Sequence, residues 1–289
     1  MIGVMDDPDE IAAEFRGTVL DGLPVEEGLG DTWVVTGVEP SRLLLAWRAA
    51  RAAVARTGRW PVLTMVDEEW LDAETEQIEA LEHAARTVDP WTVYRWWGCD
   101  SLIKPDELHL WLPDVLGADA TAHALRSLSQ PMSLFAVERW AWERLLANPA
   151  VLEQSWPRAA QHVGTGQWFA NVGEAQVVLL PTSTQWLAPA WLNYFGATQK
   201  ASRTEPSDDP GREGLAAAIR QWERQWGAEL VASWGTMLQF VVARRPALGE
   251  QAWQLALELL AVGGSLQSPS WELALAVTRS DAWFLHDRP

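Results

Sequence analysis

The sequence predicts an α+β protein, an expectation that rests on two hydrophobic patterns and on composition. Short β-branched and aromatic runs, bounded by glycine or proline, alternate with longer segments whose apolar residues recur at helical spacing. The chain has 289 residues, 48% of them hydrophobic, and this length suits one large domain or two ordinary ones. We expect two regions, residues 1–160 and residues 167–289, because a stretch of proline, glycine and polar residues lies between them.

The N-terminal region is predicted to be an α/β region that begins with a strand–helix–strand unit. Residues 31–36 are mostly β-branched and aromatic, and Gly37 follows them, which is typical of a strand. A helix then extends to the stop signal at Gly58, and residues 61–66 return as a second strand. We expect the two strands to pair in parallel, since a helix connects them.

Four further elements are expected before residue 160. An acidic helix over residues 73–86 has one apolar side, and its glutamates favour a solvated face. Leucines alternate with histidine and tryptophan over residues 108–112, which indicates a strand. Helices are predicted over residues 118–128 and 133–148, and the second is apolar nearly all round, so we expect it to be buried.

The C-terminal region shows strand and helix signals in a regular order. Residues 176–180 form a short apolar strand, and residues 213–226 carry Leu215, Ile219, Trp222 and Trp226 on one helical face. Gly235 separates two apolar runs and predicts a β-hairpin. The remaining elements are a helix over 248–262, a helix from Ser268 to Thr278 and a strand over 281–286. This order predicts a ferredoxin-like split βαβ sheet with helices on one face.

Several segments of this region also match the motifs of a known family. They are the run from Ile219 to Leu230, the Arg-Arg-Pro step that ends at Pro246, and the segments Leu180 to Trp186 and Ser280 to Phe284. In their order and spacing they resemble the bacterial domain of unknown function 4253, over about residues 174–287. The resemblance implies a fold and no chemistry, because the Cys-Pro steps common in that family are absent from residues 196–200 and 261–265.

Composition argues against several classes of function. The net charge is −17 at pH 7 and the basic residues are scattered, so we expect no nucleic-acid partner. A single cysteine, Cys99, excludes an intramolecular disulfide and cysteine-based metal centres, and it favours a reducing cytoplasm. Residues 1–10 are acidic where a secretory signal would be basic, and no apolar run reaches the roughly 20 residues of a membrane span. We expect an intracellular chain without a membrane segment, metal or cofactor.

The candidate catalytic and metal-binding signals are weak, and we predict no catalytic residue. The histidines His83, His109, His123, His162 and His286 lie far apart and form no HExxH motif. Residues Gly164 to Gly166 match only half of the glycine motif of a dinucleotide-binding site. Ser183 is not surrounded by the Gly-x-Ser-x-Gly motif of a nucleophilic serine. The carboxylate of Asp100, next to Cys99, is expected to raise the pKa of the thiol and make it less reactive. Five carboxylates suit either a hard cation or a helix start, and the helix start is the better interpretation: Asp67, Glu68, Glu69, Asp72 and Glu74.

Tryptophan is the residue type in clear excess, with 20 in the chain, and we expect about three quarters of them to be buried or half-buried. Trp96 and Trp97 are adjacent and cannot both face inward, so one of them is expected to be an exposed hot spot for a basic protein partner. The other candidate binding residues are Trp283, His286 and Asp287. We predict a non-enzymatic protein-interaction protein. The alternative is a hydrolase whose carboxylates and His286 converge only in three dimensions.

Overall fold

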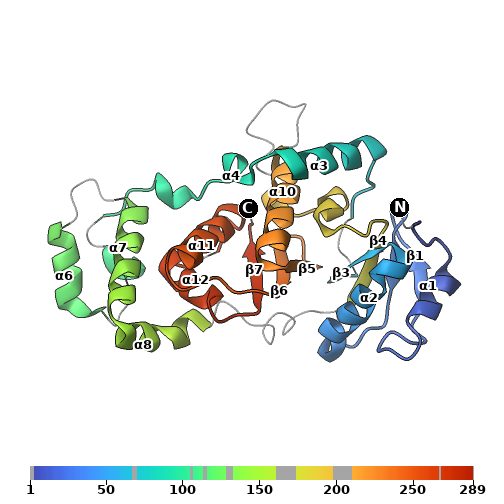
Figure 1. Cartoon of the computed structure of the whole chain (residues 1–289), viewed down its shortest axis with the longest axis horizontal. Helices are drawn as coiled ribbons and strands as arrows, with labels where there is room; N and C mark the ends of the chain where they lie inside the picture. Colours follow the sequence, from blue (N-terminus) through green and yellow to red (C-terminus); the bar gives the residue numbers. More distant parts are fainter. Residues whose placement is uncertain are drawn as a thin grey trace.

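A seven-stranded mixed sheet extends from the middle of the computed structural model, at β7, to the end that carries α1, at β1 (Figure 1). The structure describes residues 3–66, 70–104, 107–112, 116–127, 133–160, 174–197, 210–266 and 268–288. The strand order is β1-β2-β4-β3-β5-β6-β7, and every neighbouring pair is antiparallel except β3 and β5, which are parallel. The strands are β1 (Val25–Glu27), β2 (Trp33–Val35), β3 (Trp60–Met65), β4 (Ala175–Leu180), β5 (Ala228–Ser233), β6 (Met237–Val242) and β7 (Ala282–His286). The mixed α and β composition predicted from the sequence is confirmed.

The strand–helix–strand unit is present, but its two strands do not pair with each other. Helix α2 (Leu43–Thr57) follows the short 3-10 helix η1 (Pro40–Arg42) and connects β2 to β3. Strand β4 lies between them and pairs antiparallel with both. The prediction of direct parallel pairing is therefore wrong. All six residues of β4 are buried, and β4 pairs with three residues of β2 on one edge and with six residues of β3 on the other. Direct pairing of β2 with β3 would involve at most the three residues of β2.

The predicted ferredoxin-like arrangement is not confirmed. In such a sheet the first strand of the unit lies between the third and the fourth. Here the first strand of the C-terminal region, β4, is separated from β5, β6 and β7 by β3, which comes from the N-terminal region. Strand β7 pairs with β6 at the edge of the sheet. The sheet is thus continuous across the expected boundary between residues 160 and 167.

The C-terminal elements themselves are confirmed. After the 3-10 helix η7 (Gln185–Ala190) come α10 (Pro210–Trp226), the β5–β6 hairpin, α11 (Glu250–Val262), α12 (Ser270–Val277) and β7. Helix α10 ends where Gly227 adopts a φ of 60°, and Gly235 has a φ of 68° in the hairpin turn. Both are left-handed conformations that glycine adopts without a steric cost.

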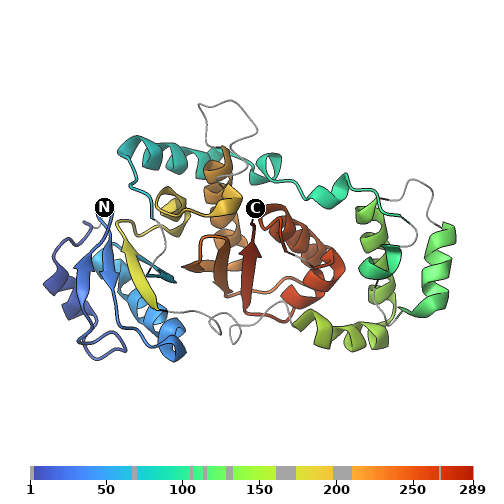
Figure 2. The ribbon, with the colours of Figure 1, turned by 180° about the vertical axis from the view of Figure 1, so that it is seen from behind.

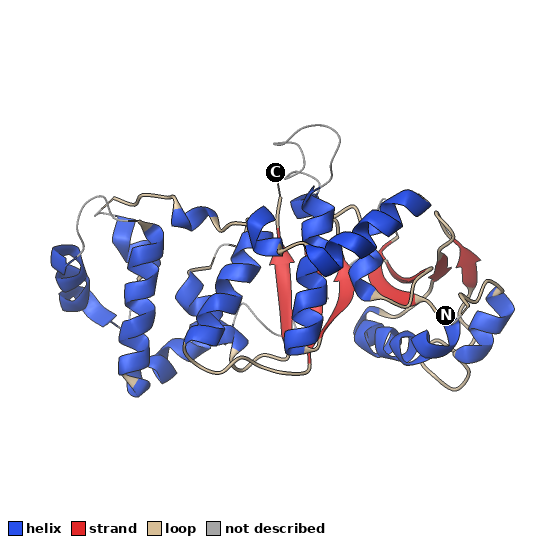
Figure 3. Cartoon of the chain, turned by 45° about the horizontal axis from the view of Figure 1, so that its top comes forward, coloured by secondary structure: helices blue, strands red, loops and turns tan. Residues whose placement is uncertain are grey.

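Three more of the helices predicted for the N-terminal region are present: α3 (Thr75–Thr87), α6 (Gly117–Ser127) and α7 (Leu134–Ala147). The structure also contains helices that were not predicted from the sequence: α1 (Pro8–Glu14), α4 (Pro90–Val93), α5 (Leu108–Trp111), α8 (Pro149–Ala159) and the 3-10 helix η2 (Trp97–Cys99). Helices α6 to α8 gather at the end of the molecule that lies away from α1 (Figure 2), and Figure 3 shows that end as helical. None of the described helices has the length and apolar character needed to cross a membrane.

The strand predicted over residues 108–112 is wrong, because this segment forms helix α5. The backbone N–H of Leu112 donates to the carbonyl of Leu108 at 3.2 Å, which closes a helical turn. Leu108 and Leu112 are both buried. Residues four apart lie on one face of a helix and also on one face of a strand, so a window this short fits either period.

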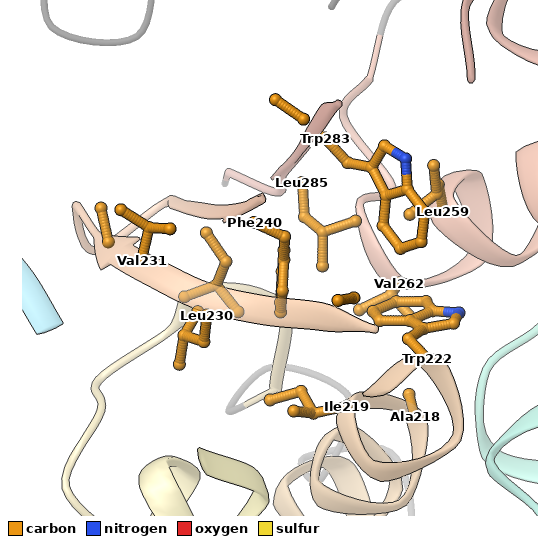
Figure 4. Close-up of a cluster of buried hydrophobic side chains, with 14 of the residues drawn as sticks. Ala218, Ile219, Trp222, Leu230, Val231, Phe240, Leu259, Val262, Trp283 and Leu285 are labelled. Atoms are coloured by element: carbon orange, nitrogen blue, oxygen red, sulfur yellow. The ribbon is translucent and has the colours of Figure 1, made fainter. Parts of the chain in front are cut away.

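Aliphatic and aromatic side chains together fill the core between the sheet and α10 (Figure 4). The Trp222 ring contacts Phe240 and Trp283 edge to face, with centroids 5.8 and 6.1 Å away. Its indole N–H donates to Oε2 of Glu258 on α11 at 3.0 Å. Every tryptophan whose side chain the structure describes is buried or half-buried. The excess of tryptophan therefore serves the packing of this chain.

Candidate binding grooves beside helix α10

The candidate tryptophans belong to the core wherever their side chains are described. Trp96 is buried and its ring lies 6.4 Å from that of Phe135, between centroids. Trp283 is fully buried against Trp222. Trp97 begins η2, and its side chain lies outside the described residues. Because Trp96 and Trp283 are covered by other parts of the chain, their indoles are not accessible to a partner.

His286 and Asp287 lie at the end of β7, where they attach the chain to a neighbouring loop. The carbonyl of His286 accepts from the backbone N–H of Ser265 at 2.9 Å, and a carboxylate oxygen of Asp287 accepts from the Ser265 hydroxyl at 3.2 Å. Burial and the charge of Arg288 lower the pKa of His286, and Asp287 partly opposes them. His286 lines neither of the two grooves described below.

The other candidate signals are dispersed. Cys99 is half-buried, and burial is the main cause that raises its pKa, with Arg95 opposing and Asp100 adding to the shift. Ser183 is exposed. Glu74 caps α3 in a capping box with Gln77, as a helix-start carboxylate should. No group of three histidine, cysteine, aspartate or glutamate side chains is placed for a metal among the described residues. Asp67, Glu68, Glu69, His162 and residues 164–166, which were also considered as candidates, lie outside the described residues.

A groove of about 490 Å³ lies between α3 and α10, two helices that pack against each other (Figure 1). One wall is a polar face of α10 that repeats at helical spacing: Ala217, Arg220, Gln221, Arg224 and Gln225. The opposite face of α10 buries Ile219, Trp222 and Trp226 in the core. The α3 wall ends with Ala85, Arg86 and Val88. We call this cavity the arginine groove.

Contacts with one buried indole fix two of the arginines. The guanidinium of Arg86 lies 5.6 Å and that of Arg220 lies 5.9 Å from the ring centroid of Trp186, which comes from η7. Nη1 of Arg220 donates to the carbonyl of Ala85 at 3.3 Å, and Arg86 forms an ion pair with Glu82 at 2.7 Å. Cation–π contacts of this kind hold a guanidinium plane against an aromatic ring.

A second groove, of about 390 Å³, lies beside β6 and the last turns of α10, and we call it the carboxylate groove. Its charged lining residues are Glu223, Glu229, Asp281 and Arg48. Glu229 is bound by Arg51 through an N–O distance of 2.6 Å. Within the described part of the chain, Glu223 and Asp281 make no ion pair. Two carboxylates thus remain available to an external cation.

Neither groove was predicted from the sequence, although one signal was present. Arg220 and Arg224 are four residues apart on a helix, a spacing at which like charges repel. In a chain with a net charge of −17, two arginines at this spacing are unexpected unless they serve a binding site. The third arginine, Arg86, comes from a distant segment, so only the fold brings the three together.

Residues 176–287 match the model of the family described as Domain of unknown function (DUF4253). The match confirms the resemblance of the C-terminal region. It includes Arg220 and Arg224 of the arginine groove and leaves Arg86 outside. No curated protein matches the chain, and no solved structure does.

Proposed function

We propose that this chain is a non-enzymatic protein-interaction protein of the cytoplasm, whose carboxylate groove receives a lysine or arginine side chain of a basic protein partner. The observation that carries the proposal is the pair of carboxylates, Glu223 and Asp281, that have no ion-pair partner among the described residues. A groove with unpaired carboxylates gives a basic side chain a defined position.

The charge of the whole chain supports the same proposal. A net charge of −17 creates a field that attracts basic proteins and speeds their encounter. Long-range attraction alone does not select one partner, whereas contacts inside a groove fix the register of a complex. The groove supplies the contact surface for this proposal, because Trp96 is buried and the side chain of Trp97 lies outside the described residues.

The test compares two variants that lose the same number of charges. In the first, Glu223→Gln is combined with Asp281→Asn in the carboxylate groove. In the control, Glu76→Gln is combined with Glu79→Gln on α3, where both side chains are exposed. Immobilised proteins are incubated with cell extract at about 50 mM and about 500 mM salt, because the higher concentration screens charge interactions beyond a few ångströms. Captured proteins are identified by mass spectrometry.

We expect the wild-type protein and the control to retain the same basic protein at low salt. The groove variant should not retain it, and high salt should release it from the wild-type protein and from the control. The affinity of the identified partner is then measured by calorimetry with each variant. Equal affinity for the groove variant and the control, or the absence of any basic partner at low salt, would contradict the proposal.

A further inference from the structure

The arginine groove has a local charge opposite in sign to that of the whole chain. Arg86, Arg220 and Arg224 line it, and among the described residues the only carboxylate paired with them is Glu82, on Arg86. Three positive charges and one negative charge leave a local excess of two positive charges. Since the chain as a whole carries −17, this excess is not a consequence of composition.

Two of the arginines are also held in place before any ligand arrives. Arg86 and Arg220 both contact the Trp186 ring, at 5.6 and 5.9 Å from its centroid, and both line the same groove, where like charges repel each other. Arg224 follows Arg220 by one helical turn and lines the same wall. An anion between these groups would turn their mutual repulsion into attraction, and the side chains would lose little freedom on binding.

The helix dipole does not explain the whole cluster. Arg86 and Arg224 lie in the last turns of α3 and α10, where positive charge is favourable. The last carbonyls of α10, however, are already bound by Arg244, whose Nη2 and Nε donate to Arg224 and Gln225 at 2.6 and 3.0 Å. Arg220 lies a turn earlier, and the side chain of Arg224 makes no bond within the described residues.

We propose that the arginine groove binds a small anion that carries at least two phosphate or carboxylate groups. Its volume of about 490 Å³ suits a small molecule. Guanidinium forks bind the oxygens of phosphate and carboxylate in pairs, and the amides of Gln221 and Gln225 add neutral donors to the same wall. This inference is independent of the carboxylate groove and of a protein partner, because it concerns other side chains and the opposite charge.

The experiment is isothermal titration calorimetry of the full chain with inorganic pyrophosphate and, separately, with citrate, at matched pH and ionic strength. The principal variant is Arg224→Gln, because this exposed arginine makes no side-chain bond that folding would lose within the described residues. A second variant combines Arg220→Gln with Arg224→Gln. The control is Arg16→Gln, which removes the same charge from an exposed position just after α1. Circular dichroism confirms that each variant is folded.

We expect one probe or both to bind the wild-type protein with one-to-one stoichiometry. Arg224→Gln should weaken binding about tenfold, which corresponds to about 1.4 kcal/mol, and the double variant should weaken it further. Arg16→Gln should leave the affinity unchanged. Binding of pyrophosphate alone assigns the site to phosphates, and binding of citrate alone assigns it to carboxylates. The proposal is overturned if neither probe binds, or if Arg16→Gln weakens binding as much as Arg224→Gln.

Discussion

Replacing Trp222 by alanine tests the packing of α10 on the sheet most directly. Trp222 is fully buried, and its ring contacts the rings of Phe240, Trp283 and Trp91, with centroids 5.8, 6.1 and 6.0 Å away. It also supplies the indole N–H that binds the buried carboxylate of Glu258. The substitution therefore creates a cavity and removes a hydrogen bond at the same point.

The expected loss combines these two effects. Truncation of a buried tryptophan to alanine costs about 3–5 kcal/mol. Among the described residues, Glu258 then keeps only its longer bond from Gln254, at 3.4 Å, and a buried group that loses a partner costs about 1–3 kcal/mol more. Since such costs are not strictly additive, we expect a decrease of about 5 kcal/mol in the free energy of unfolding. Stabilities of whole domains are about 5–15 kcal/mol, so the variant should lose between about a third and all of its stability.

The measurement is urea unfolding followed by far-ultraviolet circular dichroism, because the remaining tryptophans dominate the fluorescence. Trp222→Phe is the matched control, since it keeps an aromatic ring and removes the N–H. We expect it to cost about 2 kcal/mol, the value of a hydrogen bond to a charged group. A decrease below about 1 kcal/mol for Trp222→Ala would show that Trp222 is not a core residue, because surface substitutions have effects of that size.

Two further predictions concern a buried carboxylate and the autonomy of the C-terminal region. Burial raises the pKa of Glu138 to about 7, although the bonds that this carboxylate accepts from Ser270 oppose the shift. The protonated form is favoured in the folded state, so the stabilising contribution is present below pH 4.5 and is lost as the pH rises to about 7. Glu138→Gln should remove this loss, so the free energy of unfolding at pH 8 should be about 3 kcal/mol higher than that of the wild-type protein. The measurement is the urea midpoint of both proteins from pH 5 to 8. The same pH dependence of the midpoint in both would contradict the prediction. Residues 167–289 expressed alone should not unfold cooperatively, because they lack β3 between β4 and β5. A sharp thermal transition of that fragment would refute this expectation.

A helix or hairpin could be predicted from the sequence wherever it buries one face and leaves the other face polar. Helix α10 shows this, because Ile219, Trp222 and Trp226 recur at helical spacing and are all buried. The β5–β6 hairpin was predicted because Gly235 supplies a left-handed turn between two apolar runs. The alternation of leucines over residues 108–112 misled the assignment at α5, because Leu108 and Leu112 fit either period.

The order of the strands could not be predicted in the same way. Strand β4 is buried at all six positions, so its sequence has no alternation that would indicate a face or a neighbour. Its pairing with β2 and β3 depends on contacts between distant segments. The two grooves could not be predicted either, because they too depend on contacts between distant segments. The polar face of α10 is visible in the sequence, but its approach to Arg86 on α3 is a property of the fold.

Strand β3 shows that the matched region depends on the rest of the chain. Residues 176–287 cover β5 and nearly all of β4, yet in the sheet these two strands lie on either side of β3, which comes from outside the match. Five of the six residues of β3 are buried, and the Trp60 indole donates to the carbonyl of Leu230 on β5 at 3.1 Å. The arginine groove has the same construction, with Arg220 and Arg224 inside the match and Arg86 outside it. A ligand held by all three arginines is therefore recognised by the whole chain, and the matched region alone supplies only one wall of the site.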